Sequence, residues 1–367
     1  MYGIKKLNKI SPVIEEVFDE KYSISDDETD PVGIMVRSYD MSDYAVNNNL
    51  LAIGRAGAGV NNIPVRKMTE KGIVVFNTPG ANANAVKELT VLAMLLASRD
   101  VIGGNLWVNS LETDVAKTAE KGKSRFAGRE IFGKKVGVVG LGAIGVLVGN
   151  ACVNLGMEVI GYDPYLTDSN REKLDKRIKL AGLDEVLSES DIITLHLPLL
   201  DGTKNLIDDK AVGKMKNGVI LINMSRGGLV DFDAVKKGIA CGKIAKYVVD
   251  FPDEKVIRQD NVIVFPHLGA STDEAEDNCA RSAAEQLKDY IENGNVLHGV
   301  NFPSVNKPRT DKIRTCVFAT IAAKEYLENL PYDKVIGEKN GYVYAIIDAA
   351  EDIKSAADGI IRVRKIV

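Results

Sequence analysis

This sequence is poor in cysteine and histidine, and neither residue occurs in a spacing typical of metal ligands. The chain of 367 residues holds only three histidines and four cysteines. Scattered cysteines are typical of free thiols in a reducing compartment, so we expect buried thiols, no disulfide framework and no metal site. The four cysteines are Cys152, Cys241, Cys279 and Cys316.

The sequence also lacks a long hydrophobic run and a strong excess of either charge. No stretch of about eighteen apolar residues occurs, and the first residues do not resemble a signal peptide, so we expect a cytoplasmic protein with no membrane partner. The net charge is −4 and the isoelectric point is about 5.7. These values argue against a broad basic surface that recruits nucleic acid. An anionic substrate would therefore need local arginine or lysine side chains.

Short apolar runs alternate with polar segments of helical length throughout the chain. This alternation predicts an α/β fold with doubly wound parallel sheets. Longer helices are expected at 82–99 and 272–293, and the first should be buried or packed on another copy because it is apolar over much of its surface. The segment 301–310 contains two prolines and predicts a linker. Beyond it, alternating strands and helices are expected at 312–320, 322–330, 341–349, 351–359 and 360–366.

A glycine-rich turn between two predicted strands indicates a dinucleotide site. The apolar run 135–140 leads into Gly140, Gly142 and Gly145, which an apolar segment of helical length follows. These glycines would allow a tight turn, close approach of a pyrophosphate to the backbone, and packing of helix on strand. The first amides of that helix would face the phosphates. Asp163 ends the next strand, where its carboxylate would bind the adenosine ribose and repel a 2′-phosphate, so the sequence predicts NAD.

Polar residues follow three further predicted strands, at the edge where an open parallel sheet binds ligands. Arg226 lies in a Ser-Arg-Gly-Gly turn, and its guanidinium can bind a carboxylate with two parallel hydrogen bonds. His267 follows another strand, and an imidazole oriented by an acid can take a hydroxyl proton while a hydride leaves. This set predicts hydride transfer from a 2-hydroxy acid. Three acids follow the third strand, namely Asp250, Asp253 and Glu254. We expect His196 to pack or to line the nucleotide pocket, and His298 to lie at the surface.

Six motifs are similar to those of the D-isomer-specific 2-hydroxyacid dehydrogenases. They are GRAGAGVNNI, FNTPGANANAVKELT, GVVGLGAIG, HLPLLDGTKNLI, INMSRGGLVD and FPHLGAST. The resemblance runs from the N-terminus to about Pro303 and continues more weakly to the end. It implies a flavodoxin-like substrate-binding domain at 1–97 with 270–303 and a Rossmann-type NAD-binding domain at 98–269. It also implies a small, shortened α+β domain of the ACT type at 304–367.

The resemblance further implies a reaction and a catalytic set. The reaction is NAD-dependent oxidation of D-3-phosphoglycerate to 3-phosphohydroxypyruvate, the first step of L-serine biosynthesis, by a homodimer or homotetramer. The family's catalytic arginine and histidine fall on Arg226 and His267. Its glutamate falls on Glu254, and Asp253 stays an alternative because the segment 251–255 is shorter than the family's pattern and no proline follows it.

Binding residues also carry over from the resemblance. Cofactor contacts fall on Gly140, Gly142, Ala143, Ile144, Gly145, Asp163, Pro198, Thr203, Met224, Ser225, Asp250 and Gly269. Substrate contacts fall on Arg37, Ser38, Arg55, Ala58, Gly59, Val60 and Asn82. We expect Asp250 to accept a hydrogen bond from the nicotinamide carboxamide. Because 3-phosphoglycerate carries about three negative charges, one arginine on an acidic protein would not neutralise it, whereas Arg37 and Arg55 would add two more.

Other functions stay open at this stage. One is a different D-2-hydroxyacid dehydrogenase, acting for example on 2-hydroxyglutarate, and the discriminating feature is whether Arg37 and Arg55 converge on a phosphate. The other is an NAD-sensing corepressor or scaffold that uses the same fold. The C-terminal region also lacks the loop with which related domains cup serine, so we expect no inhibition by serine.

Overall fold

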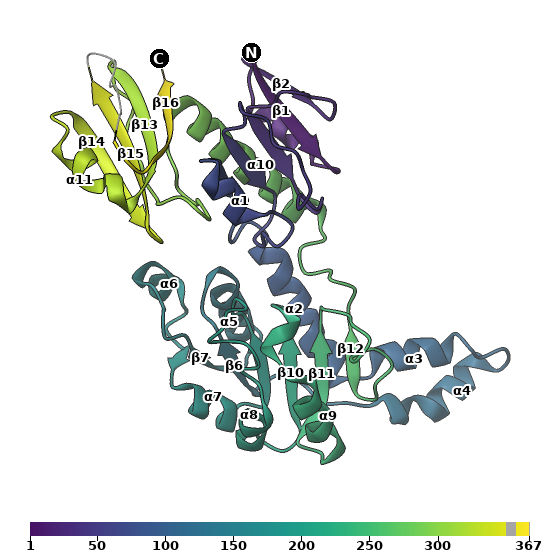
Figure 1. Ribbon diagram of the computed structural model, residues 1–367. Helices are drawn as coiled ribbons and strands as arrows, with labels where there is room; N and C mark the ends of the chain where they lie inside the picture. The colour runs from purple at the N-terminus through teal and green to yellow at the C-terminus, as the bar shows by residue number, and fades with distance from the viewer. Residues whose placement is uncertain (350–356, 367) are drawn as a thin grey trace. The chain divides into compact units, whose positions relative to one another are not determined.

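The computed structural model describes residues 1–349 and 357–366, and these residues form two compact units. Unit 1 comprises Met1–Asn82 and Thr272–Val367, and unit 2 comprises Ala83–Ser271 (Figure 1). The predicted division into three domains stays a prediction. Its first boundary, at 97/98, falls within a helix whose buried face joins the core of unit 2.

Unit 2 is built on a parallel sheet of seven strands. The strands are β6 (Lys135–Val139), β7 (Glu158–Tyr162), β8 (Lys179–Leu180), β9 (Ile192–Leu195), β10 (Val219–Asn223), β11 (Ile244–Val249) and β12 (Val262–Val264). Their order is β12-β11-β10-β9-β6-β7-β8, so the direction of winding reverses between β6 and β9. This is the doubly wound order of the Rossmann fold, and ligands bind such sheets beside the reversal. The predicted fold class is confirmed for this unit.

Helices cover both faces of this sheet because successive strand residues point to opposite sides. Val136, Val138 and Ile222 pack on one side with α2 (Ala83–Ser98) and α5 (Ala143–Asn154). Val139 and Ile193 pack on the other side. The helices of that second core are α7 (Leu183–Glu189), α8 (Asp209–Lys214) and α9 (Phe232–Ala240). The remaining helix of the wound portion is α6 (Asp168–Lys173).

Apolar side chains stay exposed where α2 continues into α3 (Val101–Val108) and α4 (Val115–Gly122). These side chains are Leu92, Leu95, Val101, Ile102, Leu106 and Val115, which we call the α2–α4 patch. Trp107 of α3 contacts Phe126 with tilted rings whose centroids are 5.2 Å apart, and the guanidinium carbon of Arg125 lies 4.1 Å from the Trp107 ring centroid. Among the described residues no single helix is long and apolar enough to cross a membrane, although α2 and α3, bent by 69°, pass that test as a pair.

The N-terminal part of unit 1 is a parallel sheet of five strands. The strands are β1 (Tyr2–Leu7), β2 (Tyr22–Ser25), β3 (Gly33–Val36), β4 (Ala52–Arg55) and β5 (Val74–Phe76), in the order β2-β1-β3-β4-β5. This is the flavodoxin-like order, as predicted. Two short elements accompany it, η1 (Pro12–Glu16) and α1 (Val65–Glu70).

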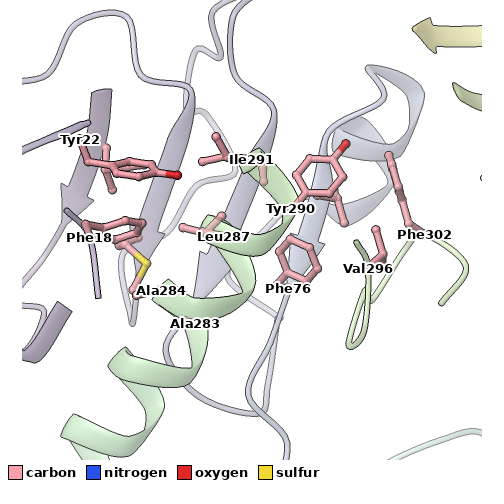
Figure 2. Close-up of a cluster of buried hydrophobic side chains, with 14 of the residues drawn as sticks. Phe18, Tyr22, Phe76, Ala283, Ala284, Leu287, Tyr290, Ile291, Val296 and Phe302 are labelled. Atoms are coloured by element: carbon pink, nitrogen blue, oxygen red, sulfur yellow. The ribbon is translucent and has the colours of Figure 1, made fainter. Parts of the chain in front are cut away.

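The helix α10 (Asp273–Asn293) packs against this sheet and confirms the helix expected at 272–293. Thr272 caps its start by accepting a hydrogen bond from the Ala275 amide at 3.1 Å. Gly294 ends it with φ of 77°, a conformation that glycine adopts without strain. Leu287 and Tyr290 of α10 lie among side chains from the sheet and from the segment after the helix (Figure 2).

The C-terminal part of unit 1 is an antiparallel sheet that has four strands in the described residues. The elements are β13 (Ile313–Thr320), η4 (Ile321–Ala323), α11 (Lys324–Asn329), β14 (Asp333–Lys339), β15 (Tyr342–Ala349) and β16 (Ile360–Ile366). The strand order β14-β15-β13-β16 is that of a split βαβ sheet, the pattern expected for an ACT-type domain. The predicted shortening of this domain stays a prediction. The helix expected at 351–359 lies mostly outside the described residues.

The segment 301–310, predicted as a linker, connects α10 to β13 and is packed against the core of unit 1. Phe302 is fully buried and stacks on Phe318 of β13 with ring centroids 3.7 Å apart. Val305 pairs with Val296 through two backbone hydrogen bonds, and it joins the same core as α10. The two prolines do not keep this segment in solvent, because the apolar side chains of Phe302 and Val305 are buried in the core.

A buried ionic network also ties the C-terminal sheet to the end of α10. Arg314 of β13 and Asp348 of β15 face each other with Nε 2.8 Å from Oδ1, and Lys307 lies 3.1 Å from the same carboxylate. Arg314 also donates to the carbonyl oxygens of Asn293 and Pro308. Burial alone would raise the pKa of Asp348, but the hydrogen bonds from Arg314 and Lys307 outweigh burial and lower the pKa to about 2.

The cysteines agree with the expectation of free thiols, with one correction. All four are unpaired, and Cys152, Cys279 and Cys316 are buried. Cys241 is exposed, because it follows the last residue of α9 at a turn on the surface.

Candidate active site

The glycine turn after β6 has the shape that a pyrophosphate requires. Gly140 has φ of 96°, and a Cβ there would lie 2.6 Å from the carbonyl oxygen of His196. A Cβ on Gly145 would lie 1.8 Å from the carbonyl oxygen of Gly140, so helix and strand approach too closely for any larger residue. Gly142 differs, because no heavy atom lies within 4 Å of a Cβ placed there. The open side of the turn is thus the start of α5, where amides and dipole favour an anion.

Asp163 follows β7 and is bound to the glycine turn by its own carboxylate. Its Oδ2 accepts a hydrogen bond from the Leu141 amide at 2.8 Å, and its Oδ1 accepts one from the Tyr165 amide at 2.8 Å. A carboxylate oxygen can accept more than one hydrogen bond, so these bonds hold the group in place without using all its capacity. The turn and the acid therefore lie together, as the dinucleotide pattern requires.

Arg226 is placed by a turn that the buried Asn223 organises. The Asn223 side chain accepts from the Ser225 amide at 3.1 Å and donates to the Arg226 carbonyl oxygen at 2.8 Å. Ser225 donates its hydroxyl to the Leu195 carbonyl oxygen at 2.7 Å, which joins the turn to the neighbouring strand β9. Sequence reasoning missed Asn223, although a polar residue at the end of an otherwise apolar strand was a visible signal.

Asp250 holds the loop that carries His267. The carboxylate is buried, and its two oxygens accept from the amides of Leu268 and Gly269, both at 2.7 Å. His267 itself has φ of 60°, an uncommon value for a residue with a side chain. Two hydrogen bonds directly after a strained residue explain how the loop keeps that conformation. Binding of the nicotinamide carboxamide, the role expected for Asp250, stays a prediction.

An aromatic ring lies between the two predicted catalytic side chains. The Phe251 ring centroid is 4.9 Å from that of His267 and 5.9 Å from the guanidinium carbon of Arg226. Within the described residues no ion pair joins His267 to Glu254 or to Asp253. Glu254 is exposed, and its assignment stays a prediction. Asp253 accepts hydrogen bonds from the amides of the next turn, which gives it a local structural role.

His196 is buried beside the glycine turn, and its imidazole Nε2 lies 3.0 Å from the Thr194 hydroxyl oxygen. Burial lowers the pKa of His196 to about 3, so the imidazole is neutral at pH 7. The loop that follows closes on itself, because Thr203 donates to the Pro198 carbonyl oxygen at 2.6 Å and accepts from the Leu200 amide. His298 of unit 1 and His267 of unit 2 are both exposed, and the catalytic role of His267 stays a prediction.

The predicted substrate residues lie on unit 1, at the carboxyl ends of neighbouring strands. Arg37 follows β3 and Arg55 ends β4. The Arg55 guanidinium folds over Gly57, where a Cβ would lie 1.7 Å from its Nη1. Thr78 ties this loop down, because its hydroxyl accepts from the Gly57 amide at 2.8 Å. Arg37 Nη1 lies 2.6 Å from a carboxylate oxygen of Glu276 in the first turns of α10. Sequence reasoning missed Thr78 and Glu276.

The predicted site residues therefore fall into two sets, one on each unit. Unit 2 carries Gly140, Gly142, Ala143, Ile144, Gly145, Asp163, Pro198, Thr203, Met224, Ser225, Arg226, Asp250, Glu254, His267 and Gly269. Unit 1 carries Arg37, Ser38, Arg55, Ala58, Gly59, Val60 and Asn82. Ser38 is exposed, whereas Met224 and Ser225 are buried under the Arg226 turn.

Comparison with known proteins defines the class first. Residues 91–269 match the NAD-binding domain of the D-isomer specific 2-hydroxyacid dehydrogenases, so unit 2 is an NAD-binding domain. The hydroxypyruvate reductase of Thermotoga maritima is 36% identical over 65% of this chain and 77% of its own length. The D-3-phosphoglycerate dehydrogenase of Archaeoglobus fulgidus is 37% identical over 74% of this chain and 52% of its own length. This chain belongs to the D-isomer-specific 2-hydroxyacid dehydrogenases, a family of NAD-dependent oxidoreductases.

Solved structures agree with the fold. The D-lactate dehydrogenase TP0037 of Treponema pallidum superimposes with a TM-score of 0.67 at 22% identity, covering 82% of this chain and 99% of its own. The NAD-bound 3-phosphoglycerate dehydrogenase of Entamoeba histolytica gives 0.64 at 26% identity, covering 82% and 98%. The chain spans about half the length of the curated phosphoglycerate dehydrogenases that it matches, as with the Archaeoglobus fulgidus enzyme.

Proposed function

We propose that this protein oxidises D-3-phosphoglycerate to 3-phosphohydroxypyruvate with NAD, the reaction that begins L-serine biosynthesis. The observation that carries the proposal is the carboxyl edge of the unit 2 sheet. The glycine turn follows β6, Arg226 follows β10, Asp250 follows β11 and His267 comes three residues after the end of β12. Because these strands are parallel, all four features lie along one edge, beside the reversal in winding where such sheets bind ligands.

In this proposal each side chain of unit 2 has a chemical task. Arg226 binds the substrate carboxylate through its guanidinium, and the His267 imidazole takes the proton of the 2-hydroxyl. NAD, when bound, accepts the hydride from the carbon that carries this hydroxyl. The open face at Gly142 and the carboxylate of Asp163 are the features of this chain that fit the cofactor. Asp250 and Phe251 keep the His267 loop in place.

The choice of a phosphorylated substrate rests on unit 1 and on the relatives. Arg37 and Arg55 supply two positive charges at neighbouring strand ends, which suits a substrate with more than one anionic group. Phosphoglycerate dehydrogenases of Archaeoglobus fulgidus and Methanocaldococcus jannaschii are 37% and 36% identical to the chain over the matched residues. We therefore assign the phosphate to these arginines.

We also propose that the protein works as a homodimer or homotetramer in the cytoplasm. The α2–α4 patch leaves Leu106 68% exposed and Val101 55% exposed, and apolar surface of this kind favours burial against another copy. Light scattering should give at least twice the monomer mass. Leu106→Glu should shift the protein towards monomer, whereas Leu200→Glu, at an exposed leucine outside the patch, should not. A monomeric wild type would contradict the proposal.

The function is tested by following NADH formation with 3-phosphoglycerate, glycerate and 2-hydroxyglutarate, with and without L-serine. We expect 3-phosphoglycerate to give the highest kcat/KM, and we expect serine to have no effect. Preference for 2-hydroxyglutarate would make Arg37 and Arg55 carboxylate-binding residues. Tight NAD binding without turnover of any of the three would favour a sensor or scaffold.

One observation favours a second candidate function. The hydroxypyruvate reductase of Thermotoga maritima is matched over 77% of its own length, more than the phosphoglycerate dehydrogenase of Archaeoglobus fulgidus at 52%, and hydroxypyruvate carries no phosphate. Oxidation of NADH with hydroxypyruvate should therefore be measured beside the reaction above. A higher kcat/KM for hydroxypyruvate than for 3-phosphohydroxypyruvate in the same direction would replace the first proposal with the second.

A further inference from the structure

Arg37 of the candidate phosphate site already has an anionic partner within unit 1. Its Nη1 lies 2.6 Å from Oε1 of Glu276, and the two side chains are 33% and 30% exposed. Ion pairs that water reaches are weak, so this contact can be broken or shared at small cost. The pair therefore leaves Arg37 able to bind another anion, while Glu276 competes for one of its donor groups.

Three charged groups gather around one buried thiol in this part of unit 1. Burial raises the pKa of the Cys279 thiol, the charges of Arg55 and Arg37 oppose this rise, and the charge of Glu276 adds to it. All three charges are thus close enough to the same sulfur to act on it. Together they sum to one positive charge, whereas the two arginines alone would present two.

The structure of α10 does not require the Glu276 carboxylate. Thr272 already caps the helix, and Asp273 and Glu274 already place acidic groups in its first turn. Glu274 lies two residues before Glu276 and is exposed. Its charge has the same sign and the same effect on the helix dipole, but Glu276 is the one that contacts Arg37.

We propose that Glu276 is a specificity-determining residue, whose carboxylate weakens binding of doubly anionic phosphate groups relative to singly anionic carboxylates. The inference rests on the proposed function, because it takes Arg37 and Arg55 as the residues that bind the substrate anion. A phosphate that binds Arg37 either displaces the Glu276 carboxylate or is repelled by it. The electrostatic repulsion grows with the negative charge of the bound group. An unphosphorylated hydroxy acid meets less of this repulsion.

The test compares Glu276→Gln with Glu274→Gln, which removes the same charge from the same helix. We expect Glu276→Gln to raise kcat/KM for 3-phosphoglycerate by about tenfold and for glycerate by about twofold or less. Glu274→Gln should leave both within about twofold of wild type, because its charge lies in solvent. Glu276→Asp, which keeps the charge, should also stay near wild type.

A second readout does not depend on turnover. Inorganic phosphate, added to each full-length variant, should raise the unfolding temperature more for Glu276→Gln than for Glu274→Gln, and added salt should shrink the difference. Failure of the wild type to oxidise 3-phosphoglycerate would remove the proposed function, yet the phosphate measurement would still decide the role of Glu276. Lower phosphate affinity in Glu276→Gln would mean that Glu276 orients Arg37, and equal effects of the two variants would mean a general charge effect. Either result overturns the inference.

Discussion

The two units hold their charged site residues in different ways. In unit 2, the carboxylates of Asp163 and Asp250 accept hydrogen bonds from backbone amides, and Arg226 donates to the Ser225 carbonyl oxygen. In unit 1, Arg37 is held by the side chain of Glu276, and both groups are reached by water. A backbone amide cannot move without moving the fold, whereas a carboxylate on a helix surface can turn away.

The two units therefore differ in how firmly their charged site residues are held. In unit 2, the buried carboxylate of Asp250 holds the loop of His267, whose proposed catalytic role requires a fixed position. In unit 1, the partly exposed pair of Arg37 and Glu276 can rearrange at small cost in stability, which suits the specificity role proposed for Glu276.

Substitution of His267 should have the largest effect on activity. We expect His267→Asn to lower kcat by about a thousandfold, because the proton acceptor is lost. Asparagine tolerates positive φ, so the loop should keep its shape. Loss of rate is measured by NADH absorbance, and binding of NADH by its fluorescence, which should not change. His298→Asn alters an exposed histidine of unit 1 and should keep full activity. A fully active His267→Asn enzyme would exclude this histidine as the acceptor.

A buried carboxylate in unit 1 should behave like those of unit 2. Asp348→Asn leaves the buried Arg314 without its counter-charge, and we expect a loss of about 3–5 kcal/mol in the free energy of unfolding. Asp333→Asn should cost much less, because the Asp333 side chain that contacts Lys307 is 59% exposed. Urea unfolding of the full chain measures both.

The pH dependence of stability follows from the same carboxylate. The pKa of Asp348 is lowered from 3.8 to about 2 in the folded protein. Its contribution to stability is therefore present above pH 4 and is lost as the pH falls from about 4 towards 2. The wild type should lose stability more steeply than Asp348→Asn in that window, and parallel curves would contradict the assignment.

The variant Asp250→Asn tests whether Asp250 holds the His267 loop or binds the cofactor. Asp250→Asn keeps one acceptor oxygen but places an NH₂ group opposite a backbone amide, so the loop should loosen. We expect kcat to fall about a hundredfold, equal to about 2.7 kcal/mol, with little change in the Kd for NAD. Asp208→Asn is the control, since Asp208 also accepts from a backbone amide of unit 2, at the start of α8, but is not among the predicted site residues. A large rise in the Kd for NAD would support the predicted carboxamide contact instead.

Phe251 should give the smallest of these effects. Phe251→Leu keeps most of the volume but removes the ring between His267 and Arg226, so we expect kcat to fall about tenfold. Phe251→Tyr should restore most of the rate. Phe232→Leu removes a comparable ring contact, with Tyr247, elsewhere in unit 2 and should not affect kcat. The pH profile of kcat should shift in Phe251→Leu but not in Phe232→Leu, because only the first variant removes a ring that contacts the His267 imidazole.

Much of the fold could be predicted because its signals are local. The helix expected at 272–293 and the glycine turn were both found where the sequence indicated, since caps, apolar spacing and turn glycines act within a few residues. The strand ends that carry Arg226 and His267 followed from the alternation of strands and helices. The packing of the predicted linker could not be foreseen, because burial of Phe302 depends on Phe318 and α10, which no local pattern specifies.

By itself, the sequence determined the α/β class, the dinucleotide turn and the types of side chain at the candidate site. Residue identity and short-range spacing were sufficient, because backbone conformation and functional-group chemistry are properties of neighbouring residues. The tertiary structure decided which groups meet. It paired Arg37 with Glu276, placed Phe251 between Arg226 and His267, and turned Asp250 towards the His267 loop. Such contacts arise only when distant segments pack together, so they depend on the whole fold.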